Sequence, residues 1–498
     1  MSATRSPQTL PPAPTVRRSR RSYSAAVRNR INGDWTDSRL NAAREIRDAL
    51  ELLRSNAREA ERNDPLYSRA LSLLVTGIVG SRGFLLKSLT SRPDGRSDDV
   101  AASILERHWR AWAGSRVTID GRLDWMGALQ LAVRSWLRDG EVFVRLLYRD
   151  GRPVLQVLEG DMVPVRLDDP ERGIVSGIEL DASGAPLAYH IATRHPGEHG
   201  YGIASQPDTV RVPADEIVHL FLPERPGQVR GVPAGAAAMD QLRLLRGYQE
   251  AELSAARMNA SRPMTIEQVE AESQYLGDGT GEDGDEEKPI EIDMAPGGAT
   301  MLPHGFRVVY NPAQHPAGAF EPFVRQCIRS FATAMGLSYA VLSRDLSSVN
   351  YSSLRIENQH QARHFETLQR HVVETLVRPV WEHVLRTDVM RGAIGSGRIV
   401  LRASDLERHR QARWIAQPHP IVERQDIEEA RERIRLGVST LTRECLKLTG
   451  CELDEIVAER KAERELLAAH GLVDVLEQDA TAAQINATEQ EEVEHEAL

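Results

Sequence analysis

The stretch Asn350-Tyr-Ser-Ser-Leu-Arg355, together with Arg225-Pro-Gly-Gln-Val-Arg-Gly-Val-Pro233 upstream, decides how the fold of this chain is interpreted. Neither segment contains a nucleophile–base pair, a metal-ligand spacing or a glycine-rich phosphate loop. Each lies at a junction with a long helical pattern. The residues themselves therefore indicate an architectural role.

The helix that follows the upstream segment is predicted over Ala236–Ala260. It contains one glycine (Gly247) and no proline, it is rich in strong helix formers, and Pro233 and Pro263 bound it. Its length is about 37 Å. By itself, the pattern is typical of an amphipathic helix in a core. The residues that make its apolar face are Ala238, Leu242, Leu245, Leu253, Ala256 and Ala260.

A returning helix is predicted over Phe320–Met335, and its apolar stripe stops at Gly336. Between the two helices, Pro263–Gly318 contains strand-like pieces at Pro289–Met294 and Arg307–Tyr310, among many glycines and prolines. Together these segments predict a helical hairpin with an irregular excursion at its tip.

After this hairpin, Leu337–Val349 interrupts the helical pattern, and Asn350 or Ser352 can cap the next helix. That helix is predicted from Ser353 to Arg386, with a kink at Pro379 because proline removes a backbone donor. Three more helices are predicted toward the C-terminus: Ile427–Leu436, Thr440–Thr449 and Leu453–Ala469.

The first half of the chain predicts an α+β domain. Helical spacing of apolar residues occurs in four segments: Asn41–Leu53, Pro65–Val79, Val100–Trp112 and Leu123–Leu137. Alternating patterns bounded by turn signals then predict five strands: Glu141–Tyr148, Pro153–Leu158, Ile174–Leu180, Pro186–Thr193 and Ile217–Phe221. Because the turns are too short for crossover helices, mostly antiparallel pairing is expected.

Composition narrows the class of protein. The 498 residues suggest roughly two to four domains, and the net charge of −10 argues against a protein that holds nucleic acid on a broad basic surface. Three cysteines fit a reducing compartment. The longest apolar run, Ala70–Val79, is about half the length of a membrane-spanning helix. With no apolar signal segment at the N-terminus, a soluble intracellular protein is expected.

Charge is distributed unevenly. Residues 1–30 contain seven arginines and no acid, residues 267–293 contain eleven acids and one lysine, and residues 477–498 contain seven acids and no Lys or Arg. Both ends are too polar or too proline-rich to form a core, so disordered tails are expected there.

Five segments resemble, in order and spacing, the signature of the lambda-type portal proteins of tailed phages. They are Asp139-Gly-Glu-Val-Phe-Val144, Leu158-Glu-Gly-Asp161, Arg225–Pro233, Gly336-Leu-Ser-Tyr-Ala-Val-Leu-Ser-Arg-Asp345 and Asn350–Arg355. The resemblance runs from about Arg28 to about Leu472 and rests on the collinearity of the segments.

The resemblance implies a portal fold of the α+β class, with an α/β wing, a long helical stem hairpin, a small β-containing clip and a helical C-terminal crown-like region. The implied division is 1–27 (basic disordered arm), 28–235 (wing), 236–262 (first stem helix), 263–318 (clip), 319–337 (second stem helix), 338–352 (channel loop), 353–420 (wing with the long helix), 421–476 (crown-like region) and 477–498 (acidic disordered tail).

The resemblance also implies a structural subunit that is not an enzyme and holds no cofactor or metal. About twelve copies would close a ring at one capsid vertex, since a heterologous interface closes only at a fixed rotation. The ring would conduct double-stranded DNA, without sequence specificity, during packaging and ejection. Its implied partners are terminase, head-completion and tail connector proteins, and capsid and scaffold proteins, with no membrane. Assembly would take place in the host cytoplasm, and the final location would be the virion.

A conduit must not hold DNA tightly, because every phosphate contact adds salt-dependent affinity and a ring multiplies each cation. The candidate channel residues are Arg344, Ser347, Ser348, Asn350 and Tyr351 in the loop, and Arg243, Arg246 and Arg257 on the first stem helix. For the stem arginines, a surface or intersubunit contact stays open as the alternative. The candidate docking surface for basic partners is the acidic clip with Asp283, Asp285, Glu286 and Glu287.

Two other functions stay open. His360 and His364 lie one helical turn apart, which suits zinc in a metal-dependent hydrolase, but Gln361 occupies the place of the glutamate in the zincin motif. The second alternative is a DNA-binding structural protein that forms no ring. The chain has no Walker lysine in a glycine loop, so movement of DNA would require an ATP-driven partner.

Overall fold

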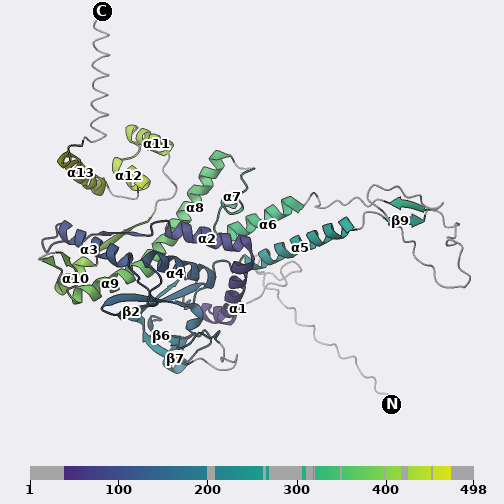
Figure 1. The fold of residues 1–498 in the computed structure, drawn as a ribbon, viewed down its shortest axis with the longest axis horizontal. Coiled ribbons are helices and arrows are strands. Elements are labelled where there is room, and N and C mark those ends of the chain that lie inside the picture. The colour runs from purple at the N-terminus through teal and green to yellow at the C-terminus, as the bar shows by residue number, and fades with distance from the viewer. Residues whose placement is uncertain are drawn as a thin grey trace, which may run out of the picture.

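The computed structural model describes residues 39–198, 208–261, 265–268, 306–309, 318, 320–347, 350–396, 399–416, 424–449 and 453–472. Figure 1 shows a body of helices and antiparallel sheets from which two helices, α5 (Met239–Ser261) and α6 (Phe320–Ala334), project side by side. We refer to these two helices as the α5–α6 hairpin. The architecture is α+β, as predicted.

Four helices form the first part of the body: α1 (Ala42–Asn63), α2 (Pro65–Val79), α3 (Asp99–Ala113) and α4 (Trp125–Asp139). The start of α2 is fixed by Asp64, whose Oδ1 accepts hydrogen bonds from the backbone N–H groups of Leu66 and Tyr67 at 2.9 and 3.0 Å. Helix α1 continues past the predicted end because small residues, Ala57 and Ala60, extend its buried face.

Two antiparallel sheets lie beside these helices, in strand orders β3-β2-β8 and β4-β5-β6-β7. The strands are β2 (Glu141–Arg149), β3 (Arg152–Glu159), β4 (Ile174–Val175), β5 (Ile178–Leu180), β6 (Pro186–Ala192), β7 (Thr209–Pro213) and β8 (Ile217–Phe221). The antiparallel pairing is confirmed. The single strand predicted over Ile174–Leu180 is wrong: Ser176 and Gly177 have φ of 50° and 81° and turn the chain between β4 and β5.

The predicted long kinked helix is two helices, α8 (Tyr351–Val372) and α9 (Arg378–Met390), joined by a π-helical turn, Val373–Val377. Pro379 lies directly after this turn. Because proline cannot donate to the carbonyl of the preceding turn, the helix widens there.

Five tryptophans connect distant parts of the body. The ring of Trp109 in α3 lies 5.0 Å from that of Trp112, 5.6 Å from those of Trp125 and Trp381, and 5.4 Å from that of Trp414. Trp414 belongs to β13 (Ala412–Ile415), which pairs antiparallel with β1 (Leu85–Ser88). The start and the end of the body are thus joined through one aromatic cluster.

In the α5–α6 hairpin, the end near the body is buried and the outer part is not. Leu242 and Leu245 are buried, whereas Leu253, predicted on the same apolar face, is 52% exposed. The ring of Tyr248 packs against Phe320 and Phe323 of α6, at 5.7 and 4.9 Å. Beyond α5 in Figure 1, β9 (Thr265–Gln268) pairs with β10 (Phe306–Val309).

Smaller elements complete the described chain. A short helix, α7 (Tyr339–Ser343), lies within the segment expected to be a loop. The remaining elements are β11 (Gly395–Ser396), β12 (Ile399–Val400), α10 (Leu406–His409), α11 (Arg424–Arg435), α12 (Leu441–Thr449) and α13 (Leu453–Ala469). None of the described helices is long and apolar enough to span a bilayer.

Candidate functional site

The segment between α7 and α8 contains four of the eight predicted channel residues. Arg344 ends α7 in the left-handed conformation, with φ of 59°, and its side chain is exposed, as is that of Ser347. Asn350 begins α8, where its Oδ1 accepts a hydrogen bond from a backbone N–H of the first turn at 2.8 Å. Ser348 lies outside the described residues, and Tyr351 is placed only as the first residue of α8.

Asp345 organises this segment from within the same chain. Its carboxylate accepts hydrogen bonds from the Tyr339 hydroxyl at 2.9 Å and from the Ser347 Oγ and N at 2.6 and 3.1 Å. Arg325 of α6 lies 3.7 Å away. The hydrogen bonds from Ser347 are the main reason why the pKa of Asp345 falls to about 2. The carboxylate stays ionised at neutral pH and holds the segment in a defined turn.

Helix α7 is attached to the body on its other side. Arg69 of α2 donates hydrogen bonds to the carbonyl oxygens of Leu342 and Val341, at 3.0 and 2.9 Å. The backbone N–H of Ser338 donates to Gln361 of α8 at 3.2 Å. Both flanks of α7 are thus fixed, one by α2 and the other by α8.

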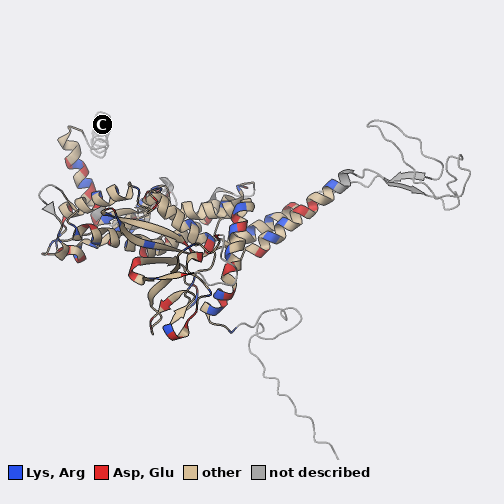
Figure 2. Ribbon diagram, turned by 60° about the horizontal axis from the view of Figure 1, so that its bottom comes forward, with Lys and Arg blue, Asp and Glu red and all other residues tan. Residues whose placement is uncertain are grey.

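The three arginines predicted on α5 are all exposed. Arg246 donates to Glu250 at 3.2 Å and lies 3.8 Å from Glu59 of α1, so part of its charge is compensated at the surface of the chain. Figure 2 shows acidic and basic residues mixed along the two projecting helices. Arg243 and Arg257 share this mixed surface. The structure does not bring these arginines together with Arg344.

A buried ion cluster at the base of the α5–α6 hairpin was not predicted. It consists of Arg54 of α1, Glu141 at the start of β2 and Arg230 in the loop that leads to α5, with exposed fractions of 1%, 0% and 1%. One oxygen of Glu141 accepts from Arg54 and, at 2.7 Å, from Arg230. Its other oxygen accepts from the backbone N–H of Gly231 at 2.9 Å and contacts His219 Nε2 at 2.9 Å.

The two arginines also hold backbone and a second carboxylate. Arg230 donates to the carbonyl oxygens of Gly160, Val163 and Ser176, at 2.7 to 3.1 Å. Arg54 donates to the carbonyl of Asp139 at 3.1 Å and to the carboxylate of Asp161 at 3.0 Å. Burial opposes ionisation of Glu141, but the neighbouring guanidinium groups of Arg230 and Arg54 dominate and hold its pKa well below the usual range.

The sequence did carry a signal for this cluster. Three of the five segments that carry the family resemblance contain members of this cluster: Glu141, Asp161 and Arg230. Their positions in the sequence do not show that they lie in contact. Arg54 lies outside those segments, and its one signal is a long cationic side chain on the otherwise apolar face of α1. Since buried charges are retained only when they are paired, a buried arginine of this kind points to an acidic partner.

The family model that describes the phage portal proteins of the lambda family matches residues 28–369 of this sequence. The chain belongs to that family. It is 29% identical to the probable portal protein of Halomonas phage phiHAP-1 over 445 residues, 87% of this chain and 84% of that protein. It is 24% identical to portal protein B of Escherichia phage lambda over 468 residues, 84% and 85% of the two chains.

Solved structures include similar chains. One is the chain of the neck of a native gene transfer agent particle, with a TM-score of 0.43 and 14% identity over 81% of this chain and 93% of that chain. The lambda family of portal proteins is a family of structural proteins of the virion.

In this portal protein the geometry gives little support to the alternative of a zinc site at His360 and His364. His360 is exposed, and the ring of His364 lies against Gly336, where an added Cβ would be 2.6 Å from Nε2. Within the described ranges, the group of three or more potential ligands is a different one: Glu159, Asp161 and His195. Its carboxylates already pair with arginines, since Arg58 lies 2.6 Å from Asp161 and 3.5 Å from Glu159.

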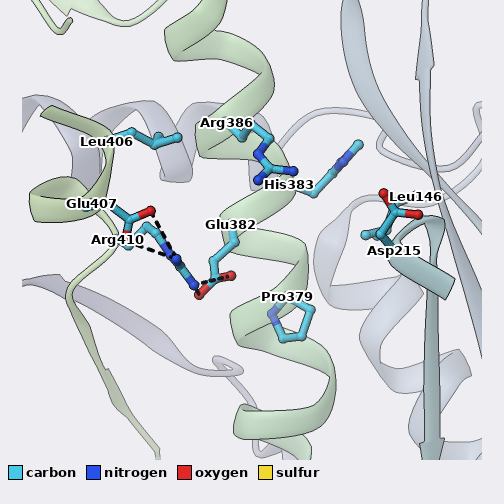
Figure 3. Close-up of a pocket in the computed structure, with 9 residues that line it drawn as sticks. All are labelled: Leu146, Asp215, Pro379, Glu382, His383, Arg386, Leu406, Glu407 and Arg410. Atoms are coloured by element: carbon cyan, nitrogen blue, oxygen red, sulfur yellow. Dashed lines mark hydrogen bonds and ion pairs between the residues drawn. The ribbon is translucent and has the colours of Figure 1, made fainter. Parts of the chain in front are cut away.

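Two other features of the portal protein complete the description. The predicted docking acids Asp283, Asp285, Glu286 and Glu287 lie outside the described residues. A cavity of about 200 Å³ lies between α9, α10 and β2 (Figure 3). Arg410 spans this cavity and pairs with Glu382 at 3.0 Å and Glu407 at 3.1 Å. Because these charges are committed to one another, they join α10 to α9.

Proposed function

We propose that this portal protein forms a closed ring of about twelve subunits at one capsid vertex, through which double-stranded DNA passes during packaging and ejection. In this proposal α5 and α6 form the stem, the segment around β9 and β10 is the clip, residues 28–235 with 353–420 form the wing, and α11–α13 belong to the crown-like region. The protein would assemble in the host cytoplasm and remain in the virion.

The observation that carries the ring is the apolar surface of the α5–α6 hairpin. Leu244 is 74% exposed, Leu253 is 52% exposed and Phe323 is 50% exposed, although all three lie on helices that carry an apolar pattern. Large exposed apolar side chains on a projecting helical hairpin suit a surface that is covered in an assembly. In a ring, each hairpin would be covered by the neighbouring hairpins.

The segment 344–350 suits light contact with passing DNA. It offers one exposed cation per subunit, Arg344, flanked by short polar side chains, while the nearby carboxylate is engaged by Tyr339 and Ser347. A ring of single cations adds a salt-dependent attraction for phosphates that is weak at each position. Such a loop would guide DNA and hinder its return without fixing it in place.

Partners would bind at the ends of the ring. We infer that the acidic residues 267–293 bind basic surfaces of terminase and of head-completion and tail connector proteins, because eleven acids and one lysine repel DNA and attract basic proteins. Capsid and scaffold proteins would contact the outside of the ring. Movement of DNA would be driven by the ATP-hydrolysing terminase.

The ring is tested by Leu253→Glu. The expected result is that wild-type protein sediments as a ring at micromolar concentration and physiological salt, whereas the variant stays monomeric with an unchanged far-UV circular dichroism spectrum. Val210→Glu is the matched control, because Val210 in β7 is also 52% exposed and lies on the body, away from the hairpin. A wild-type protein that is only monomeric or dimeric under these conditions would rule out the ring.

A further inference from the structure

We propose that the buried ion cluster of Arg54, Glu141 and Arg230 fixes the angle between the α5–α6 hairpin and the body, and thereby the number of subunits that close the ring. This inference rests on the proposed ring. It assigns to three buried residues a positioning role beyond stability of the subunit.

The cluster joins four separate segments at the point where the chain leaves the body. Arg54 comes from the middle of α1, Glu141 from the first position of β2, and Asp161 from the short 3-10 turn Gly160–Met162. Arg230 lies in the loop that leads to α5. Any rotation of that loop would have to break contacts to three other elements at once.

The contacts at Glu141 leave little freedom. Both carboxylate oxygens are used, one by the two guanidinium groups and the other by His219 and the backbone of Gly231. The His219 ring is stacked between Phe143 and Phe221, with centroids 4.3 and 4.4 Å away. The Glu141 carboxylate is therefore fixed by groups that are themselves held in place by packing.

Close steric contacts further restrict the movement of the segment that connects the body to α5. A Cβ added at Gly231 would lie 2.0 Å from the carbonyl oxygen of Gly140, and one added at Gly235 would lie 2.4 Å from the ring of Tyr67. The backbone N–H of Ala234 also donates to the carbonyl of Leu137 at 3.0 Å. The chain is thus held at Gly231, Ala234 and Gly235, shortly before α5 begins.

Such precision matters for a ring. With about twelve subunits the rotation per subunit is about 30°, and one subunit more would change it by only about 2°. In the ring, each hairpin packs on neighbouring hairpins and each body packs on neighbouring bodies. A change in the angle between hairpin and body therefore changes the rotation between subunits. Stability alone does not require charges here, because a buried ion network is often replaceable by apolar residues without loss. In this proposal the charges serve to fix the direction of the hairpin.

The test is Glu141→Gln, which keeps the shape of the side chain and removes its charge. We expect folded subunits with a lower unfolding temperature, whose rings are distributed over two or more copy numbers by native mass spectrometry, where wild type gives one. The matched control is Glu179→Gln, which removes a carboxylate from an exposed pair with Arg211 at 2.7 Å and should leave the copy number unchanged.

Arg54→Lys is the second variant, because it keeps the charge but loses the planar group that reaches Asp139, Glu141 and Asp161 together. It decides the question by the same readout where Glu141→Gln fails to fold. Rings of the single wild-type copy number from folded cluster variants would overturn the inference and leave the ring intact. Wild-type protein without rings would instead overturn the proposed function, and this inference with it.

Discussion

The base of the α5–α6 hairpin and its outer part differ in how completely contacts within the single chain bury and pair their side chains. At the base, Glu141 and Arg230 are fully buried and each makes several hydrogen bonds within the chain. In the outer part, Leu253 and Phe323 remain half exposed, with few neighbours to cover them. Within one subunit, the contacts that set the direction of the hairpin are therefore complete. The apolar surface along the hairpin is left open to other subunits.

The largest effect is expected from Arg230→Met at the base. The change leaves the Glu141 carboxylate with one guanidinium fewer and removes the donor to three backbone carbonyls, so the free energy of unfolding should fall by about 3–5 kcal/mol. Urea denaturation of monomeric protein measures it. Arg211→Met, which breaks an exposed pair with Glu179, should cost about 0–1 kcal/mol. Equal losses for the two variants would contradict the view that the base is completed within the chain.

A single glycine-to-alanine change should have opposite signs in the two regions. At Gly231 the added methyl would lie 2.0 Å from a carbonyl oxygen, so the free energy of unfolding should fall by about 1–3 kcal/mol. At Gly247, in the exposed part of α5, the added methyl meets nothing within 4 Å, and the better helix propensity should stabilise the protein by about 0.5–1 kcal/mol. Thermal unfolding of both variants decides; destabilisation by Gly247→Ala would show that the outer surface is already packed.

The comparison extends to pH, because the body contains buried histidines and neither α5 nor α6 contains any. Burial lowers the pKa below the ordinary 6.5 for His190, His219, His371, His383 and His409. These imidazoles stay neutral in the folded protein, so below about pH 6.5 the unfolded chain binds more protons than the folded one. The free energy of unfolding should therefore decrease by about 1.4 kcal/mol per pH unit for each extra proton.

Glu141 contributes little to this change, because its carboxylate is ionised in the folded protein and, above about pH 5, largely ionised in the unfolded chain as well. Urea denaturation between pH 7 and pH 5 measures the slope. The control is Val210→Glu, a variant on the exposed surface of β7 that should show the same slope as wild type. A stability that does not change over this range would contradict the assignment of neutral buried imidazoles.

The smallest effect on stability is expected at Arg344. Asparagine tolerates its left-handed conformation, so Arg344→Asn should change the free energy of unfolding by less than about 0.5 kcal/mol. It removes one exposed cation per subunit, and we expect assembled capsids to retain less full-length DNA. Arg344→Lys keeps the charge and serves as control. Normal DNA length per capsid in the asparagine variant would rule out a role of this cation in retention.

Local signals in the sequence predicted most helices correctly. Of the two residues expected to cap the helix after the break, Asn350 does so, because capping depends on residues only a few positions apart. The antiparallel hairpins followed from short turns in the same way. In contrast, the pairing of β1 with β13 joins Leu86 to Trp414, and no local pattern indicates a partner so far along the chain.

The candidate site was predicted only in part. The sequence correctly predicted a break in the helical pattern between α6 and α8, yet the turn built by Asp345 depends on the Tyr339 hydroxyl of α7, which spacing does not reveal. Periodicity identified the apolar face of α5 but not where its cover comes from, so Leu245 is buried and Leu253 is exposed. The ion cluster escaped prediction because Arg54, Glu141 and Arg230 lie far apart in sequence.

The tryptophan cluster has a consequence for the order of events during synthesis. Trp109 contacts both Trp381 and Trp414, so the core of the body cannot close until the ribosome has released the chain beyond residue 414. The helices α5 and α6 leave the ribosome well before that point, while translation proceeds at about 5–20 residues per second. For several seconds the apolar hairpin therefore exists on a nascent chain without a finished body.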